Sequence, residues 1–158
     1  MKIFKKLSIY IAILMIAALF ALAGCAPDGG SSTDDNNENG GEIMNITVKV
    51  NTEEFSATLA DNETAKAFYA LLPLTLNMTE LNGNEKYCYL PGSLPSKAQG
   101  VGSIAAGDLM LYGSSCVVLF YESFSTSYSY TRIGKLDNPS GLADALGGGS
   151  VQVVFEKA

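Results

Sequence analysis

The stretch that decides the fold is NITVKVNTEEFSATL, residues 45–59. Apolar side chains alternate with polar ones on both sides of a short polar turn at 51–53, which is the pattern of two half-buried strands. Because so few residues separate the two runs, they should pair as a β-hairpin. We therefore expect the folded part of the chain to begin with an antiparallel pair of strands.

Further strand-like runs recur at short intervals, separated by Gly, Pro, Ser and Asn. They lie at residues 74–79, 86–90, 100–104, 108–112, 116–122, 128–133 and 151–155. Two helices interrupt them: one begins at a cap on Asp61 or Asn62 and ends before Pro73, and one covers 138–146 with Pro139 in its first turn. Many short strands with two isolated helices favour a closed or nearly closed β-barrel, which hides its strand edges.

The N-terminus has the parts of a bacterial lipoprotein signal peptide. Three lysines lie within residues 1–6, and residues 7–23 follow without a charge. These 17 residues are short for a membrane span of about 20, although a retained membrane anchor is the alternative. Small residues precede a cysteine in LAGC at 22–25, which predicts cleavage after the signal peptide (1–24) and lipid attachment to Cys25. The mature chain is then expected outside the cytoplasm, held to a membrane of the bacterial cell envelope by lipid.

The rest of the chain divides into a tether and one domain. Residues 25–43 are expected to hold the lipidated cysteine and a flexible acidic tether, since 26–42 contain no large apolar side chain. Residues 44–158 are enough for one domain with its own core.

Composition excludes several function classes. The chain carries 16 acidic and 10 basic residues, for a net charge of −6, and every acid follows the predicted signal peptide. We therefore expect no nucleic-acid partner, because no basic patch is available. Histidine is absent, which removes the commonest metal ligand and general base, so we expect no metal and no cofactor.

Cys88 and Cys116 are the other two cysteines. An exported chain meets an oxidising compartment in which two thiols can pair. Both cysteines lie in apolar, strand-like runs, however, where an unpaired cysteine behaves as a small buried hydrophobe. Their spacing does not decide between these alternatives, and the apolar surroundings favour unpaired thiols. Two cysteines alone are too few for a structural zinc site.

Six short segments in the folded region carry a family resemblance. They are FSATL with DNETA (residues 55–59 and 61–65), LPLTL (72–76), NEKY (84–87), GDLMLY (107–112) and YSYTRIG (128–134). In this order they resemble the cyclophilin-like fold domains of bacteria, a group distinct from true cyclophilins and found in lipoproteins. The resemblance implies a mainly β fold: a cyclophilin-like, closed eight-stranded β-barrel with one or two short helices.

The resemblance does not extend to a catalytic site. True cyclophilins are peptidyl-prolyl isomerases that depend on an arginine in a short phenylalanine-containing strand motif, with glutamine, histidine and tryptophan lining the proline pocket. This chain has no histidine or tryptophan, and its one arginine, Arg132, lies in YTRIG, which does not match that motif. We carry over no catalytic residue and do not expect an enzyme; a divergent prolyl isomerase is the alternative.

A few side chains are candidates for ligand binding. Alternation places Tyr128, Tyr130 and Arg132 on one face of a strand, where the guanidinium can hold a carboxylate or phosphate. The simpler interpretation is an exterior arginine that stacks on tyrosines or pairs with an acid. The loop at 124–128 suits either a binding rim or a long hairpin connection.

Glu85 and Tyr87 can add a carboxylate and a ring at the barrel mouth, whereas the simpler interpretation is that Glu85 and Lys86 form a solvated charge pair. The functional hypothesis is a non-catalytic, lipid-anchored module that binds a small ligand, a peptide or an envelope protein through one end of the barrel.

Overall fold

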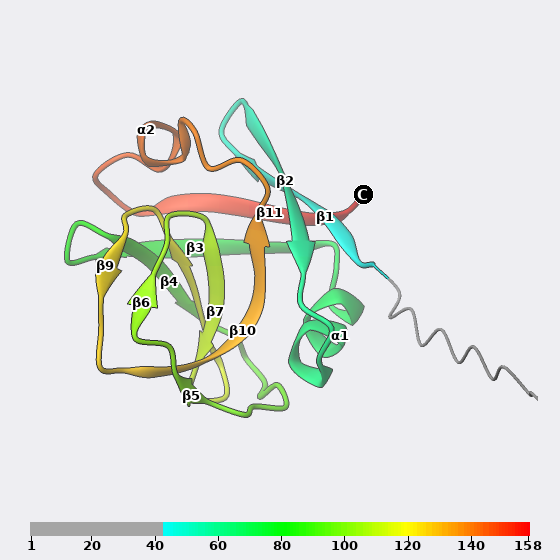
Figure 1. The fold of residues 1–158 in the computed structure, drawn as a ribbon. Coiled ribbons are helices and arrows are strands. Elements are labelled where there is room, and N and C mark those ends of the chain that lie inside the picture. The colour runs from blue at the N-terminus through cyan, green and yellow to red at the C-terminus, as the bar shows by residue number, and fades with distance from the viewer. Residues whose placement is uncertain (1–42) are drawn as a thin grey trace, which may run out of the picture. The chain divides into compact units, whose positions relative to one another are not determined.

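The computed structural model describes residues 43–158, which form eleven strands and two helices (Figure 1). In chain order these are β1 (Asn45–Val50), β2 (Glu53–Leu59), α1 (Glu63–Ala70), β3 (Leu74–Leu81), β4 (Glu85–Tyr89), β5 (Gln99–Gly100), β6 (Ser103–Ile104), β7 (Asp108–Tyr112), β8 (Cys116–Phe120), β9 (Phe124–Ser125), β10 (Ser129–Leu136), α2 (Leu142–Leu146) and β11 (Val151–Lys157). The predicted signal peptide, Cys25 and most of the predicted tether lie outside the described residues. Neither described helix is long and apolar enough to cross a membrane.

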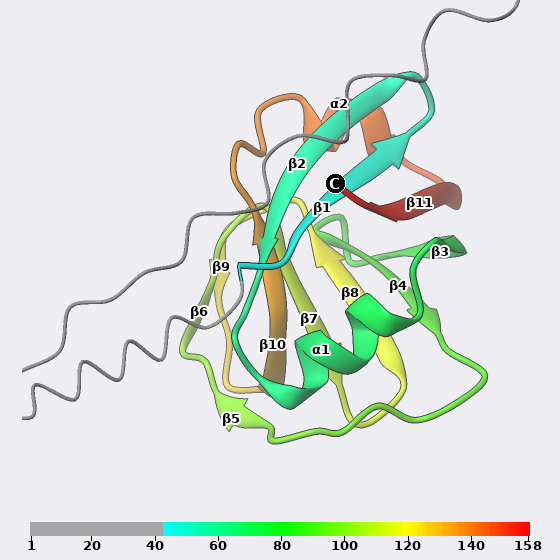
Figure 2. The same cartoon turned by 90° about the vertical axis from the view of Figure 1, so that its right-hand side faces the viewer.

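Eight of the strands close into an antiparallel barrel in the order β2, β1, β11, β3, β4, β8, β7, β10. Strand β10 pairs with β2 as well as with β7, and this second contact closes the ring (Figures 1 and 2). The predicted hairpin forms, with Val48 opposite Phe55. The closed, mainly β barrel confirms the predicted fold class, and its closure leaves no barrel strand unpaired.

One apolar cluster fills the barrel interior, because alternate side chains of each strand point inward. Helix α1 covers one end of the barrel, and α2 lies at the other (Figure 1). The Asn62 side chain caps α1 by accepting the backbone N–H of Ala65 at 2.8 Å, as predicted. Phe68 of α1 then packs edge-on against Phe155 of β11, with 5.5 Å between the ring centroids.

The second helix is shorter than predicted. It begins at Leu142 instead of 138, so Pro139 precedes the helix and does not lie in its first turn. Gly141 directly before it has a φ of 83°, a left-handed conformation that redirects the chain into the helix. Leu142 and Leu146 of this helix reach the interior cluster.

The prediction of one continuous strand at 100–104 is also wrong, because the chain turns at Gly102, whose φ is 71°. The two halves then pair with different partners: β5 with β10, and β6 with β9. Strand β9 itself was not predicted.

A second apolar cluster lies on the outer face of the barrel. Strand β8 is buried at all five positions, and β7 at four of its five, because both faces of these strands are covered. Two stretches of chain, residues 101–106 and 122–128, cover these strands from outside and pair with each other through β6 and β9 (Figure 1). We call these two stretches together the strap. Ile104 and Phe124 of the strap pack on the outward side chains of Met110 and Phe120.

Candidate functional site

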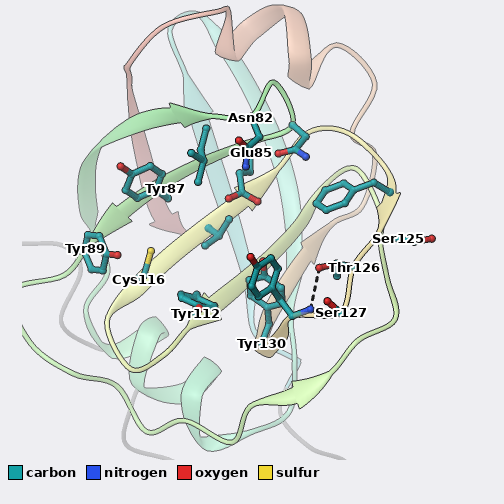
Figure 3. Close-up of a pocket in the computed structure, with 15 residues that line it drawn as sticks. Asn82, Glu85, Tyr87, Tyr89, Tyr112, Cys116, Ser125, Thr126, Ser127 and Tyr130 are labelled. Atoms are coloured by element: carbon teal, nitrogen blue, oxygen red, sulfur yellow. Dashed lines mark hydrogen bonds between the residues drawn. The ribbon is translucent and has the colours of Figure 1, made fainter.

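A pocket of about 550 Å³ opens between the strap and the outer face of β4, β8 and β7 (Figure 3). Cys116 and Val118 of β8 line it, and residues 124–128 of the strap form one wall. Its volume lies in the range of small-molecule sites, roughly 300–1,000 Å³. The pocket is therefore on the outer face of the barrel and not at an end, where the sequence placed it.

Five tyrosines line this pocket: Tyr87, Tyr89, Tyr112, Tyr128 and Tyr130. They form edge-to-face contacts, with centroids 6.0 Å apart for Tyr87 and Tyr89 and 6.2 Å apart for Tyr112 and Tyr128. Tyr130 is buried and packs on Phe120 at 5.5 Å, whereas Tyr128 is 62% exposed. The site thus has a fixed aromatic base and a more exposed aromatic rim.

Glu85 is the only acidic residue among the pocket-lining residues of the described chain. It shares the outward face of β4 with Tyr87 and Tyr89, and Figure 3 shows its carboxylate on the same side of the strands as the rings of Tyr87, Tyr112 and Tyr130. Burial raises the pKa of Glu85, and the nearby charge of Glu80 raises it further. Within residues 43–158 it forms no ion pair, and no lysine or arginine lines the pocket.

Tyr130 lies within the influence of the same carboxylate. Burial raises its pKa to about 12, and the charge of Glu85 contributes. The phenol of Tyr130 therefore stays neutral over the ordinary pH range, and Glu85 supplies the negative charge of the pocket.

Asn84 also lines the pocket, next to Glu85. Its side-chain oxygen Oδ1 is buried and has no hydrogen-bond partner among the described residues. A buried acceptor without a partner costs free energy, so it is unusual in a purely structural position.

Lys86 does not form the solvated pair that the sequence suggested, because it points into the barrel and its side chain has 0% exposure. Its Nζ donates to Glu80 and to the carbonyls of Gly147 and Gly149, at 2.6 and 2.7 Å for the two carbonyls. Tyr121 donates to the same Glu80 carboxylate at 2.8 Å. This network is structural, and it keeps Lys86 away from Glu85 and the pocket.

The structure brings Glu85, Tyr87, Tyr128 and Tyr130 together but leaves Arg132 outside the pocket. The Arg132 guanidinium lies 3.5 Å from the buried Asp108 carboxylate and borders a second, more open pocket of about 400 Å³. Alternation alone could not reveal this, because Arg132 lies further along β10 than Tyr130, beside Asp108. The arginine therefore neutralises a buried acid and does not join the tyrosines.

Cys88 and Cys116 are unpaired. They lie on the adjacent strands β4 and β8, where Cys88 is opposite Val117 and Cys116 is opposite Tyr89. Cys88 contacts the interior cluster, whereas Cys116 belongs to the outer cluster. Their side chains thus leave opposite faces of the sheet, which is incompatible with disulfide geometry.

Sequence reasoning missed Tyr89, Tyr112 and Cys116 as pocket residues. One signal was present: the run Cys116–Phe120 is apolar without alternation, which indicates a strand covered on both faces. That run required something outside the barrel, and the strap is what covers it. Within residues 43–158, no group of three His, Cys, Asp or Glu gathers closely enough to hold a metal ion.

Comparison with known proteins identifies the family. A model described as the cyclophilin-like family matches residues 48–156, which is more than half of the chain. The chain belongs to the cyclophilin-like family. This result confirms the resemblance recognised in the sequence. No curated protein matches the chain.

A similar cyclophilin-like fold occurs in a hypothetical protein from Archaeoglobus fulgidus. Its solution structure aligns with a TM-score of 0.52 and 20% identity, over 75% of this chain and 97% of that chain. At this identity the likeness concerns the fold alone. The aligned region covers nearly all of the archaeal chain, so in that protein this fold makes up almost the whole chain.

Proposed function

We propose that this protein is an extracytoplasmic lipoprotein, anchored through Cys25, whose cyclophilin-like domain binds a small molecule or peptide without catalysing prolyl isomerisation. The observation that carries the proposal is the outer-face pocket, which combines five tyrosines with a carboxylate that forms no ion pair among the described residues. Concave sites with aromatic walls and a few polar groups are typical of ligand binding.

The position of Arg132 argues against the isomerase alternative. Stabilising a twisting X-Pro amide needs a donor aimed at the substrate, and the barrier to be lowered is about 18–20 kcal/mol. The guanidinium of Arg132 instead faces the Asp108 carboxylate at 3.5 Å and lies outside the tyrosine pocket.

Exchange NMR tests catalysis and binding together. A panel of X-Pro peptides is mixed with residues 39–158, and cis/trans exchange is measured with and without the protein. We expect no acceleration above the uncatalysed rate; acceleration that disappears in Arg132→Ala would establish the isomerase alternative.

Membrane anchoring needs a separate test in cells. Wild-type protein should fractionate with membranes, and Cys25→Ala should lose this association without losing the folded domain. Unchanged membrane association of Cys25→Ala would refute the lipid anchor.

A further inference from the structure

The charged side chains that line the outer-face pocket are negative only. Glu85 is its single acidic residue, and no lysine or arginine lines it within the described chain. Two cations that neighbour pocket residues along the chain, Lys86 and Arg132, are committed elsewhere: Lys86 to three acceptors inside the barrel, and Arg132 to Asp108. The negative charge of Glu85 is therefore available to a ligand.

The aromatic lining of the pocket also favours a positively charged ligand. The faces of tyrosine rings are negative and attract cations that approach within about 6 Å, most strongly where water is excluded. Tyr87 and Tyr89 lie on β4, while Tyr112, Tyr128 and Tyr130 form a second group, with 5.6 Å between the centroids of Tyr112 and Tyr130. Rings from two sides of one carboxylate make a site suited to a positive group.

We propose that this pocket binds an organic ammonium group, held between the tyrosine rings and paired with the Glu85 carboxylate. The proposal rests on the proposed binding function and specifies its ligand class. The raised pKa of Glu85 agrees with it, since a partly buried carboxylate without a partner gains from a nearby cation.

The test uses ligand pairs that differ in charge and share their shape. Choline and its neutral isostere 3,3-dimethylbutan-1-ol probe a small free cation; Nα-acetyl-lysinamide and its Nε-acetylated form probe a lysine side chain. Binding to residues 39–158 is measured by calorimetry at pH 7. We expect at least one cation to bind about tenfold more tightly than its neutral partner, which corresponds to about 1.4 kcal/mol. Which pair shows the difference identifies the source of the ammonium group.

Matched variants locate the effect. Glu85→Gln keeps the shape of the side chain, and we expect it to abolish the preference for the cation. Glu53→Gln removes the same charge from an exposed position at the start of β2 and should leave the preference unchanged. Tyr112→Leu should weaken binding of the cation more than binding of its neutral partner. Tyr112→Phe keeps the ring face and should not show this difference.

The failure of the ammonium proposal can be distinguished from the failure of the proposed binding function. Equal binding of cation and neutral partner in the pocket would overturn the ammonium proposal and leave the binding function standing. If neither the cations nor the neutral X-Pro peptides perturb the amide signals of pocket residues, the ammonium proposal and the proposed function both fail. An equal loss of the cation preference in Glu53→Gln would also overturn the role of Glu85.

Discussion

Replacing Lys86 with methionine should lower the free energy of unfolding by about 3 kcal/mol. Removing one partner of a buried ion pair costs about 3–5 kcal/mol, because the other charge loses its compensation. The lower end applies here, since Glu80 is 23% exposed and keeps hydrogen bonds from Tyr121 and from the backbone N–H of Gly83. The carbonyls of Gly147 and Gly149 also lose their donor.

Urea denaturation measures this loss. With a slope of about 1–3 kcal/mol/M, a change of about 3 kcal/mol moves the midpoint by at least about 1 M. The double variant Lys86→Met with Glu80→Leu should recover part of the loss, because no charge is then left without its partner. A loss below about 1 kcal/mol in Lys86→Met, or no recovery in the double variant, would refute the network as a determinant of stability.

Three further predictions concern stability. Gly134→Ala should cost about 1–3 kcal/mol in urea denaturation, because an added Cβ would lie 2.7 Å from the carbonyl oxygen of Thr58 where β10 closes the barrel; an unchanged midpoint would contradict this. The raised pKa of Glu85 means that its ionisation opposes folding, so its contribution to stability declines as the pH rises from the usual value near 4.5 through the higher pKa of the folded state. Glu85→Gln should therefore melt at or above the wild-type temperature at pH 7, and a clearly lower melting temperature would show that the carboxylate is structural. Since Cys88 and Cys116 face opposite sides of the sheet, adding reductant to residues 39–158 should leave the melting temperature unchanged; a drop would reveal a disulfide.

The fold could be predicted because its main signal is local. Alternation in β1, β2 and β3 reflects a sheet with one face buried, so the inward residues are visible in the sequence. The errors occurred where the partner decides the structure: Gly102 splits a short apolar run because each half meets a different strand. No window of sequence contains that information.

Only part of the candidate site could be predicted, because alternation is a local signal and contacts between distant strands are not. Glu85 and Tyr87 share one face of β4 through local alternation, and Tyr130 could be placed on the outer face of β10 in the same way. That these strands meet under a strap is a long-range fact, and it brings in Tyr112 and Cys116. Arg132 was a candidate for binding beside the tyrosines, with pairing to an acid among the simpler interpretations, and its partner Asp108, on another strand, could not be identified from the sequence.

Mapping backbone amide shifts of ¹⁵N-labelled residues 39–158 during separate titrations with choline and with Nα-acetyl-lysinamide tests the central claim most directly, because it shows where each ligand binds. The account predicts that at least one of the two causes saturable shifts concentrated at Glu85, Tyr87, Tyr112 and residues 124–128 of the strap. Saturable shifts concentrated instead around Arg132 and the second pocket, or no saturable shifts with either ligand, would contradict it.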